Sequence, residues 1–89
     1  MVVYKIVYTK TAVKQIPLLK SAKLDERVKK LIDVLKQSPF QNPPPYEKLV
    51  GDMAGAYSRR INVQHRLVYQ VYEPEQTVKI ISMWSHYEY

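Results

Sequence analysis

Two segments of the chain carry side chains that can act on a phosphodiester. Residues 56–71 contain Arg59, Arg60 and Arg66 among β-forming residues, and the last five residues of the chain include His86. Guanidinium groups are fixed cations that bind phosphate oxygens, and an imidazole titrates near neutral pH. The same residues would also suit an exposed, solvated sheet face. Composition alone therefore leaves both interpretations open.

Strands are needed to position these side chains. Segments rich in β-branched and aromatic residues predict strands at Val2 to Tyr8, Ala56 to Val63, His65 to Tyr72 and Thr77 to Trp84. Arg66 alternates with Leu67 along one of them, so the two side chains are predicted on opposite faces of the sheet. Gly51 and Gly55 suit turns before the second strand.

Two helices are predicted between the first strand and the others. Apolar residues recur at helical spacing in two stretches, Ala12, Val13, Ile16 and Leu19, then Leu24, Val28, Leu31, Ile32 and Leu35. Pro17 predicts that the first helix kinks or breaks into two short pieces. The order β-α-α-β-β-β predicts an α+β fold, with two N-terminal helices packed on one side of a small antiparallel sheet.

Length and composition limit the classes of function. Eighty-nine residues, 46% of them hydrophobic, predict a single folded domain over residues 1–89. The chain has no cysteine, which excludes disulfides, thiolate zinc sites and a cysteine nucleophile. His65 and His86 lack metal-binding spacing. We therefore expect neither a metal nor a cofactor.

The net charge of +6 is concentrated in the first part of the chain. Met1 to Lys36 holds nine Lys and Arg against three acids, whereas Gln37 to Tyr89 holds five of each. The predicted RNA contacts of this basic part are Lys20, Lys23, Lys29 and Lys30. An acidic protein segment and a merely solvated helix surface remain alternatives.

No apolar run approaches the roughly 18 residues that a membrane-spanning helix needs. The first ten residues also lack the sustained apolar region of a signal peptide. We therefore expect a cytoplasmic protein without a membrane association.

A proline-rich connection follows the second predicted helix. Pro39 ends that helix, and the run Asn42-Pro43-Pro44-Pro45 imposes a stiff, extended backbone. This connection is predicted to deliver Tyr46 and Glu47 to a defined place.

The order of elements, together with three motifs, resembles the YoeB/Txe family of bacterial toxins within the RelE/ParE superfamily. The motifs are Ser58-Arg59-Arg60-Ile61, His65-Arg66-Leu67-Val68-Tyr69 and His86-Tyr87. Members of this family are mRNA endoribonucleases that cut in the ribosomal A site, and a YefM/Axe-type antitoxin silences them. The resemblance implies the toxin of a type II toxin-antitoxin system, with ribosome, mRNA and antitoxin as partners. Monomer and homodimer both stay open as its active form.

The resemblance also implies which residues are catalytic. RNA can be cut when its own 2′-hydroxyl attacks the adjacent phosphorus, which requires a base near that hydroxyl and an acid near the leaving oxygen. Glu47 matches the family's glutamate and is the candidate base, and His86 is the candidate acid. Arg66 would stabilise the charge of the transition state. Tyr87 would orient the phosphate or stack on a base.

The remaining motif residues receive supporting roles. Arg59 and Arg60 are predicted as further RNA contacts. His65 alternates away from Arg66 and is predicted to be structural.

Two other functions remain open: a ParE-like inhibitor of DNA gyrase without catalysis, and a basic module that binds RNA without cutting it. The fold alone cannot separate them.

Overall fold

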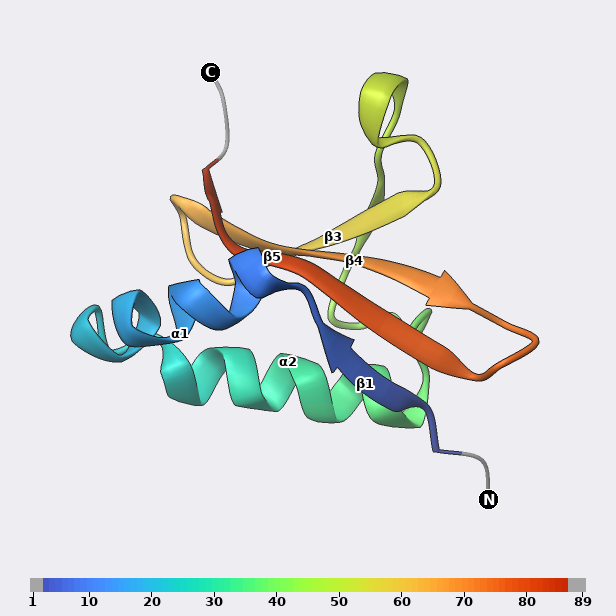
Figure 1. Ribbon diagram of the computed structural model, residues 1–89, viewed down its shortest axis with the longest axis horizontal. Helices are drawn as coiled ribbons and strands as arrows, with labels where there is room; N and C mark the ends of the chain where they lie inside the picture. Colours follow the sequence, from blue (N-terminus) through green and yellow to red (C-terminus); the bar gives the residue numbers. More distant parts are fainter. Residues whose placement is uncertain (1–2, 87–89) are drawn as a thin grey trace.

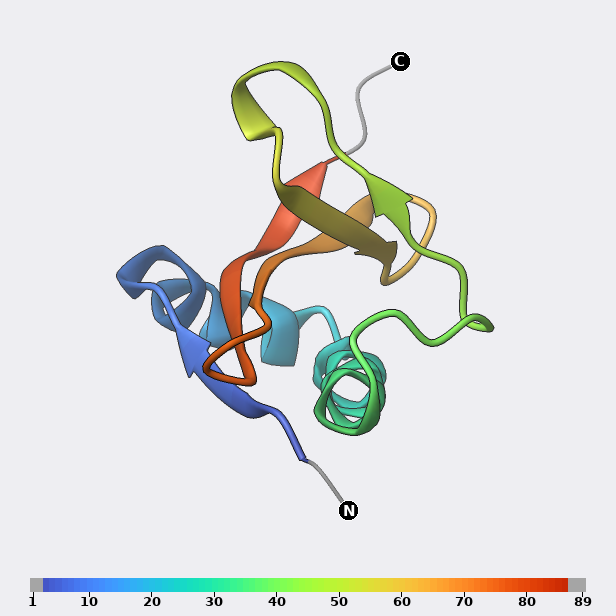
Figure 2. The same cartoon turned by 90° about the vertical axis from the view of Figure 1, so that its right-hand side faces the viewer.

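One sheet with the strand order β1-β5-β4-β3-β2 organises the protein. The computed structural model describes the backbone of residues 3–86 and the side chains of residues 3–84. Its elements are β1 (Lys5–Tyr8), α1 (Lys10–Ser21), α2 (Asp25–Gln37), β2 (Glu47–Lys48), a 3-10 turn η1 (Gly51–Met53), β3 (Ala56–Arg60), β4 (His65–Tyr72) and β5 (Thr77–His86). Both helices lie on the same side of the sheet (Figures 1 and 2).

The strand pairing makes the sheet mixed. β1 pairs with β5 in parallel, and the other three neighbouring pairs are antiparallel. A parallel pair needs a long crossover connection, to which α1 and α2 contribute here. The predicted α+β fold with two helices packed on a small sheet is confirmed. The prediction of an antiparallel sheet of four strands is wrong in two respects, since β1 pairs in parallel with β5 and the two-residue strand β2 makes a fifth strand.

Helix α1 is continuous through Pro17. The helix begins after Thr9, whose side-chain oxygen accepts a hydrogen bond from the backbone N–H of Ala12 at 3.1 Å. The predicted break into two short pieces is therefore wrong. A proline removes only one backbone donor, and the exposed position of Pro17 leaves its ring outside the packed core.

The core lies between the helices and one face of the sheet. It is formed by Ala12, Leu19, Val28, Ile32 and Leu35 from the helices and by Leu67, Tyr69, Val78, Ile80 and Met83 from the strands. Burial of each large apolar side chain contributes about 1.5–3 kcal/mol. This packing fixes the orientation of the sheet. The other face is covered in part, since Ser58 and Val68 on it are 1% and 2% exposed.

The two helices are short. α1 has 12 residues and α2 has 13, whereas about 20 apolar residues are needed to cross a bilayer. Within residues 3–86, no helix is long and apolar enough for that purpose.

Candidate active site

Arg66 lies on the sheet face that points away from the core. Its neighbour in β4, Leu67, is fully buried in the core, and alternation along the strand directs Arg66 to the other side. The predicted separation of these two side chains is confirmed. Arg66 pairs with Arg60 of β3 and with Ser85 of β5. Directly opposed residues have Cα atoms about 4.5–5.5 Å apart, so the two arginines extend from neighbouring positions.

Strand β2 brings Glu47 to the same region. Glu47 pairs with Ser58, which precedes Arg60 by two residues and therefore shares its face. Ser58 in turn pairs with Val68, two residues after Arg66. The usual spacings of a sheet put the Cα atoms of Glu47 and Arg66 roughly 12 Å apart. Ser58 and Val68, which lie between them on the same face, are 1% and 2% exposed.

Arg59 has a different role from the one predicted for it. Its side chain is 1% exposed, and its guanidinium donates hydrogen bonds to the carbonyl oxygens of Pro39, Gln41 and Pro44. The bonds to Pro39 and Gln41 measure 3.0 and 2.9 Å. This burial corrects the prediction that Arg59 contacts RNA, because the guanidinium is hydrogen-bonded to the proline-rich loop and is not accessible. Arg59 anchors the loop that leads to Glu47.

Aromatic side chains complete this anchor. The rings of Phe40, Tyr46 and Tyr57 pack against one another with centroids 5.2–5.9 Å apart, and Arg59 lies 5.0 Å above the ring of Tyr46. Tyr69 donates its hydroxyl to the carbonyl of Pro39 at 2.9 Å. Burial raises the pKa of Tyr69 above its usual 10.0 although Arg59 acts to lower it, so the hydroxyl keeps its proton at neutral pH.

The backbone of His86 lies beside Arg66 at the end of β5. His86 pairs with His65, and the residue before His86 pairs with Arg66. The side chain of His86 and all of Tyr87 lie outside the described residues, so their catalytic roles stay predictions. His65 is buried and stacks on Trp84 with ring centroids 3.9 Å apart. The structural role predicted for His65 is confirmed.

Thr9, which caps α1, and Gln15 within α1 hold β5 in place, and no sequence pattern predicted either role. β5 is irregular opposite Arg66 and Val68, and such a bulge leaves backbone groups unpaired in the sheet. The side-chain oxygen of Gln15 accepts the N–H of Met83 at 2.6 Å, and the hydroxyl of Thr9 donates to the carbonyl of Ile81 at 2.7 Å. These contacts support the strand that carries His86.

The four lysines predicted to contact RNA are all exposed. Lys20 is in the last turn of α1, Lys23 lies in the connection between the helices, and Lys29 and Lys30 belong to α2. The structure thus keeps these cations exposed on the helical layer (Figure 1).

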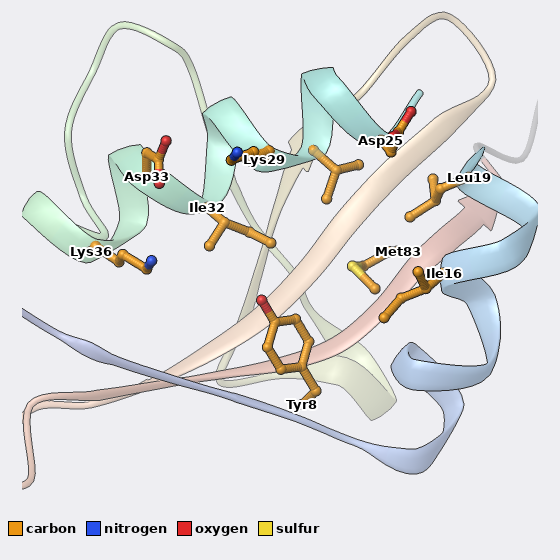
Figure 3. A pocket seen from close by; sticks show the side chains of 10 residues that line it. Tyr8, Ile16, Leu19, Asp25, Lys29, Ile32, Asp33, Lys36 and Met83 are labelled. Carbon is orange, nitrogen blue, oxygen red and sulfur yellow. The ribbon is translucent and has the colours of Figure 1, made fainter. Parts of the chain in front are cut away.

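A cavity of about 250 Å³ lies between the helical layer and the sheet. Tyr8, Ile32 and Met83 point into it (Figure 3). Its lining contains none of the predicted catalytic residues. The charged residues of its lining have no net charge, since they are two acids and two bases: Asp25, Asp33, Lys29 and Lys36. This cavity is therefore separate from the candidate active site.

No group of three or more His, Cys, Asp or Glu side chains within the described part of the chain is placed to hold a metal ion. The absence of a metal or cofactor from the reaction stays a prediction.

Solved toxin structures share this fold. A YoeB/ParE toxin from Agrobacterium tumefaciens superposes with a TM-score of 0.83 at 35% sequence identity, covering 93% of this chain and 99% of that chain. YoeB from Staphylococcus aureus has been solved as a dimer and in a heterotetrameric complex with YefM. It gives a TM-score of 0.79 at 29% identity, covering 94% of this chain and 98% of that chain. The two helices on a five-stranded mixed sheet define a toxin of the RelE-type fold.

The sequence comparisons give the family. Residues 6–87 match the YoeB-like toxin of bacterial type II toxin-antitoxin system. The Toxin YoeB of Synechocystis is 38% identical over 66 residues, which cover 74% of each chain. The chain belongs to the YoeB-like toxin family, as its motifs predicted.

Proposed function

We propose that this toxin is a ribosome-dependent mRNA endoribonuclease that cuts messages in the A site and so inhibits translation. The observation that carries the proposal is the sharing of one sheet face by Glu47, Arg60 and Arg66, beside the strand that ends at His86. A carboxylate, two guanidinium groups and an imidazole supply a base, an electrostatic clamp and an acid.

In the proposed reaction, Glu47 takes the proton of the 2′-hydroxyl as this oxygen attacks the adjacent phosphorus. The bond between phosphorus and the 5′-oxygen breaks, and His86 as imidazolium protonates the departing oxygen. Arg66 stabilises the additional negative charge of the transition state, with Arg60 as a second cation. Tyr87 orients the phosphate or stacks on a base. The products are a 2′,3′-cyclic phosphate and a 5′-hydroxyl end.

The proposed partners follow from the relatives. YoeB of Staphylococcus aureus forms a complex with YefM, so we propose a YefM-type antitoxin for this toxin. The same relative is also solved as a dimer, and a homodimer is part of the proposal. Action on translating ribosomes places the toxin in the cytoplasm.

Cleavage is expected to persist in excess EDTA, because the attack of a 2′-hydroxyl needs only a base, an acid and charge stabilisation. The measurement uses purified toxin at high concentration with ribosome-free RNA, since ribosomes themselves require Mg²⁺. End analysis should find 2′,3′-cyclic or 3′-phosphate together with 5′-hydroxyl ends. Products with a 3′-hydroxyl end would falsify the mechanism.

Replacement of Lys20, Lys23, Lys29 and Lys30 by Gln is expected to weaken co-sedimentation with ribosomes. If all four contact phosphates, the slope of log affinity against log salt should become shallower by about 3, since each contact contributes about 0.7–0.9. Lys79→Gln, outside the helical layer, is the control and should keep the parental slope. An unchanged slope for the fourfold variant, with an unchanged melting temperature, would remove these lysines from ribosome docking.

A further inference from the structure

A cavity of about 240 Å³ lies between α2, the proline-rich loop and the end of β3. Its walls are Leu31, Val34, Pro44 and Ile61, and its polar lining consists of Arg27, Lys30 and Arg60. The α2 residues at positions 27, 30, 31 and 34 form one stripe of the helix, because residues three and four apart are neighbours on its surface. The cavity is thus built by a helix face and a strand end that only the fold brings together.

All the charged residues that line this cavity are basic. Three cations line it, and none of its lining residues in the described part of the chain is acidic. Glu26 and Asp33 are neighbours of Lys30 along α2 but do not line the cavity. The Nη1 of Arg27 donates to the carbonyl of Ile61 at 3.3 Å, which holds this guanidinium at the wall. The three cations are exposed at the edge of apolar walls, and their summed positive potential attracts an anion.

Arg60 connects this cavity to the candidate active site. It lines the cavity and pairs directly with Arg66 across β3 and β4. Cations therefore continue from Arg66 through Arg60 to Arg27 and Lys30, around the end of the sheet. A row of several cations suits the successive phosphates of an RNA strand. A carboxylate of an acidic protein segment could also bind the cations of the cavity. Such a ligand would not explain why these cations adjoin the catalytic Arg66.

We infer that the cavity binds a phosphate of the message that flanks the phosphate being cut. This inference rests on the proposed function, since it takes the phosphate at Arg66 as the reacting one. The cavity would hold the message on one side of the cleaved bond and so determine which phosphate lies at Arg66. Lys30 and Arg27 are binding residues in this account and take no part in the chemical step.

The test measures toxin binding to ribosomes programmed with 2′-O-methyl messages, which cannot be cut by the proposed reaction. In a series of such messages, one phosphate at a time around the A-site codon is made neutral as a methylphosphonate. For the parent toxin, the neutral phosphate at the occupied position should weaken binding about tenfold, the range of a charge-assisted hydrogen bond. For Lys30→Gln, the same message should weaken binding less than twofold, because the contact is already lost.

Lys36→Gln is the matched control, since Lys36 belongs to the same helix but lines the other cavity. It should keep the full tenfold response. Arg27→Gln serves as a second variant, with its melting temperature measured because Arg27 also bonds to Ile61. If Lys30→Gln and Arg27→Gln respond to every methylphosphonate as the parent does, the cavity holds no phosphate of the message.

Two further results would overturn the inference, and they distinguish it from the proposed function. Loss of antitoxin binding by Lys30→Gln, with the methylphosphonate response intact, would assign the cavity to an acidic protein segment. If only the inference about the cavity is wrong, the parent toxin still cuts ordinary messages in the A site. A parent toxin that neither binds programmed ribosomes nor cuts their messages would remove the proposed function together with this subsite.

Discussion

Arg66→Ala is expected to slow mRNA cleavage by about 10²- to 10³-fold, the usual cost of removing one donor that stabilises transition-state charge. Arg66 lies on the outer face of β4 rather than in the core, so the variant should fold and bind antitoxin like the parent. The measurement is cleavage by purified toxin on programmed ribosomes, together with growth after expression without antitoxin. Gln70→Ala, on the same strand and face, is the control and should retain activity.

His86→Gln and Glu47→Gln extend this prediction to the proposed acid and base. Loss of either is expected to cost about 10²- to 10⁴-fold. Glu47→Gln should be milder if ribosomal groups substitute for the carboxylate. Parental cleavage by a well-folded His86→Gln would show that His86 is not the acid. If the parent stops growth without any new mRNA ends in the cell, inhibition of gyrase becomes the better explanation.

Arg59→Met is expected to lower the free energy of unfolding by about 2 kcal/mol or more, because a carbonyl group left without a donor costs about 1–3 kcal/mol. The carbonyls of Gln41 and Pro44 lose the guanidinium donor, whereas that of Pro39 keeps the hydroxyl of Tyr69. Met fills much of the space but donates no hydrogen bond to Pro39, Gln41 or Pro44. A domain of this size should then melt more than about 10 °C lower. Urea unfolding and thermal melting measure the two effects.

Two further variants separate the geometry of Arg59 from its charge. Arg59→Lys keeps a cation but replaces the planar fork, so it should recover only part of the lost stability. Arg60→Met changes the exposed neighbour and should alter the free energy of unfolding by no more than about 0.5 kcal/mol. A melting temperature of Arg59→Met within about 2 °C of the parent would contradict the anchoring role.

The positions of the elements were largely predictable from local patterns. The strand predicted at His65 to Tyr72 matches β4, and the alternation of Arg66 with Leu67 correctly separated the outer face from the core. These features depend on the period of two in a strand, which neighbouring residues display directly. The continuity of α1 through Pro17 was not predictable in the same way, because packing of the helix can outweigh a local penalty.

The residue types of the candidate site were also visible in the sequence, but their grouping was not. Glu47 and Arg66 are 19 positions apart in the sequence, and only the register of β2, β3 and β4 places them on one face. The pattern could not distinguish Arg59 from Arg60, since adjacent arginines in a strand point to opposite sides and either order fits a charged segment.

The sequence by itself determined the presence of two helical segments, the principal strands, the basic residues 1–36 and the motifs of the family. Each of these depends on local spacing or on composition, which the chain carries without folding. Tertiary structure decided that Arg59 is buried, that β1 pairs in parallel with β5, and that Arg27 meets Arg60 at one cavity. These outcomes depend on long-range packing, because a buried guanidinium requires carbonyl partners that the fold alone brings within reach.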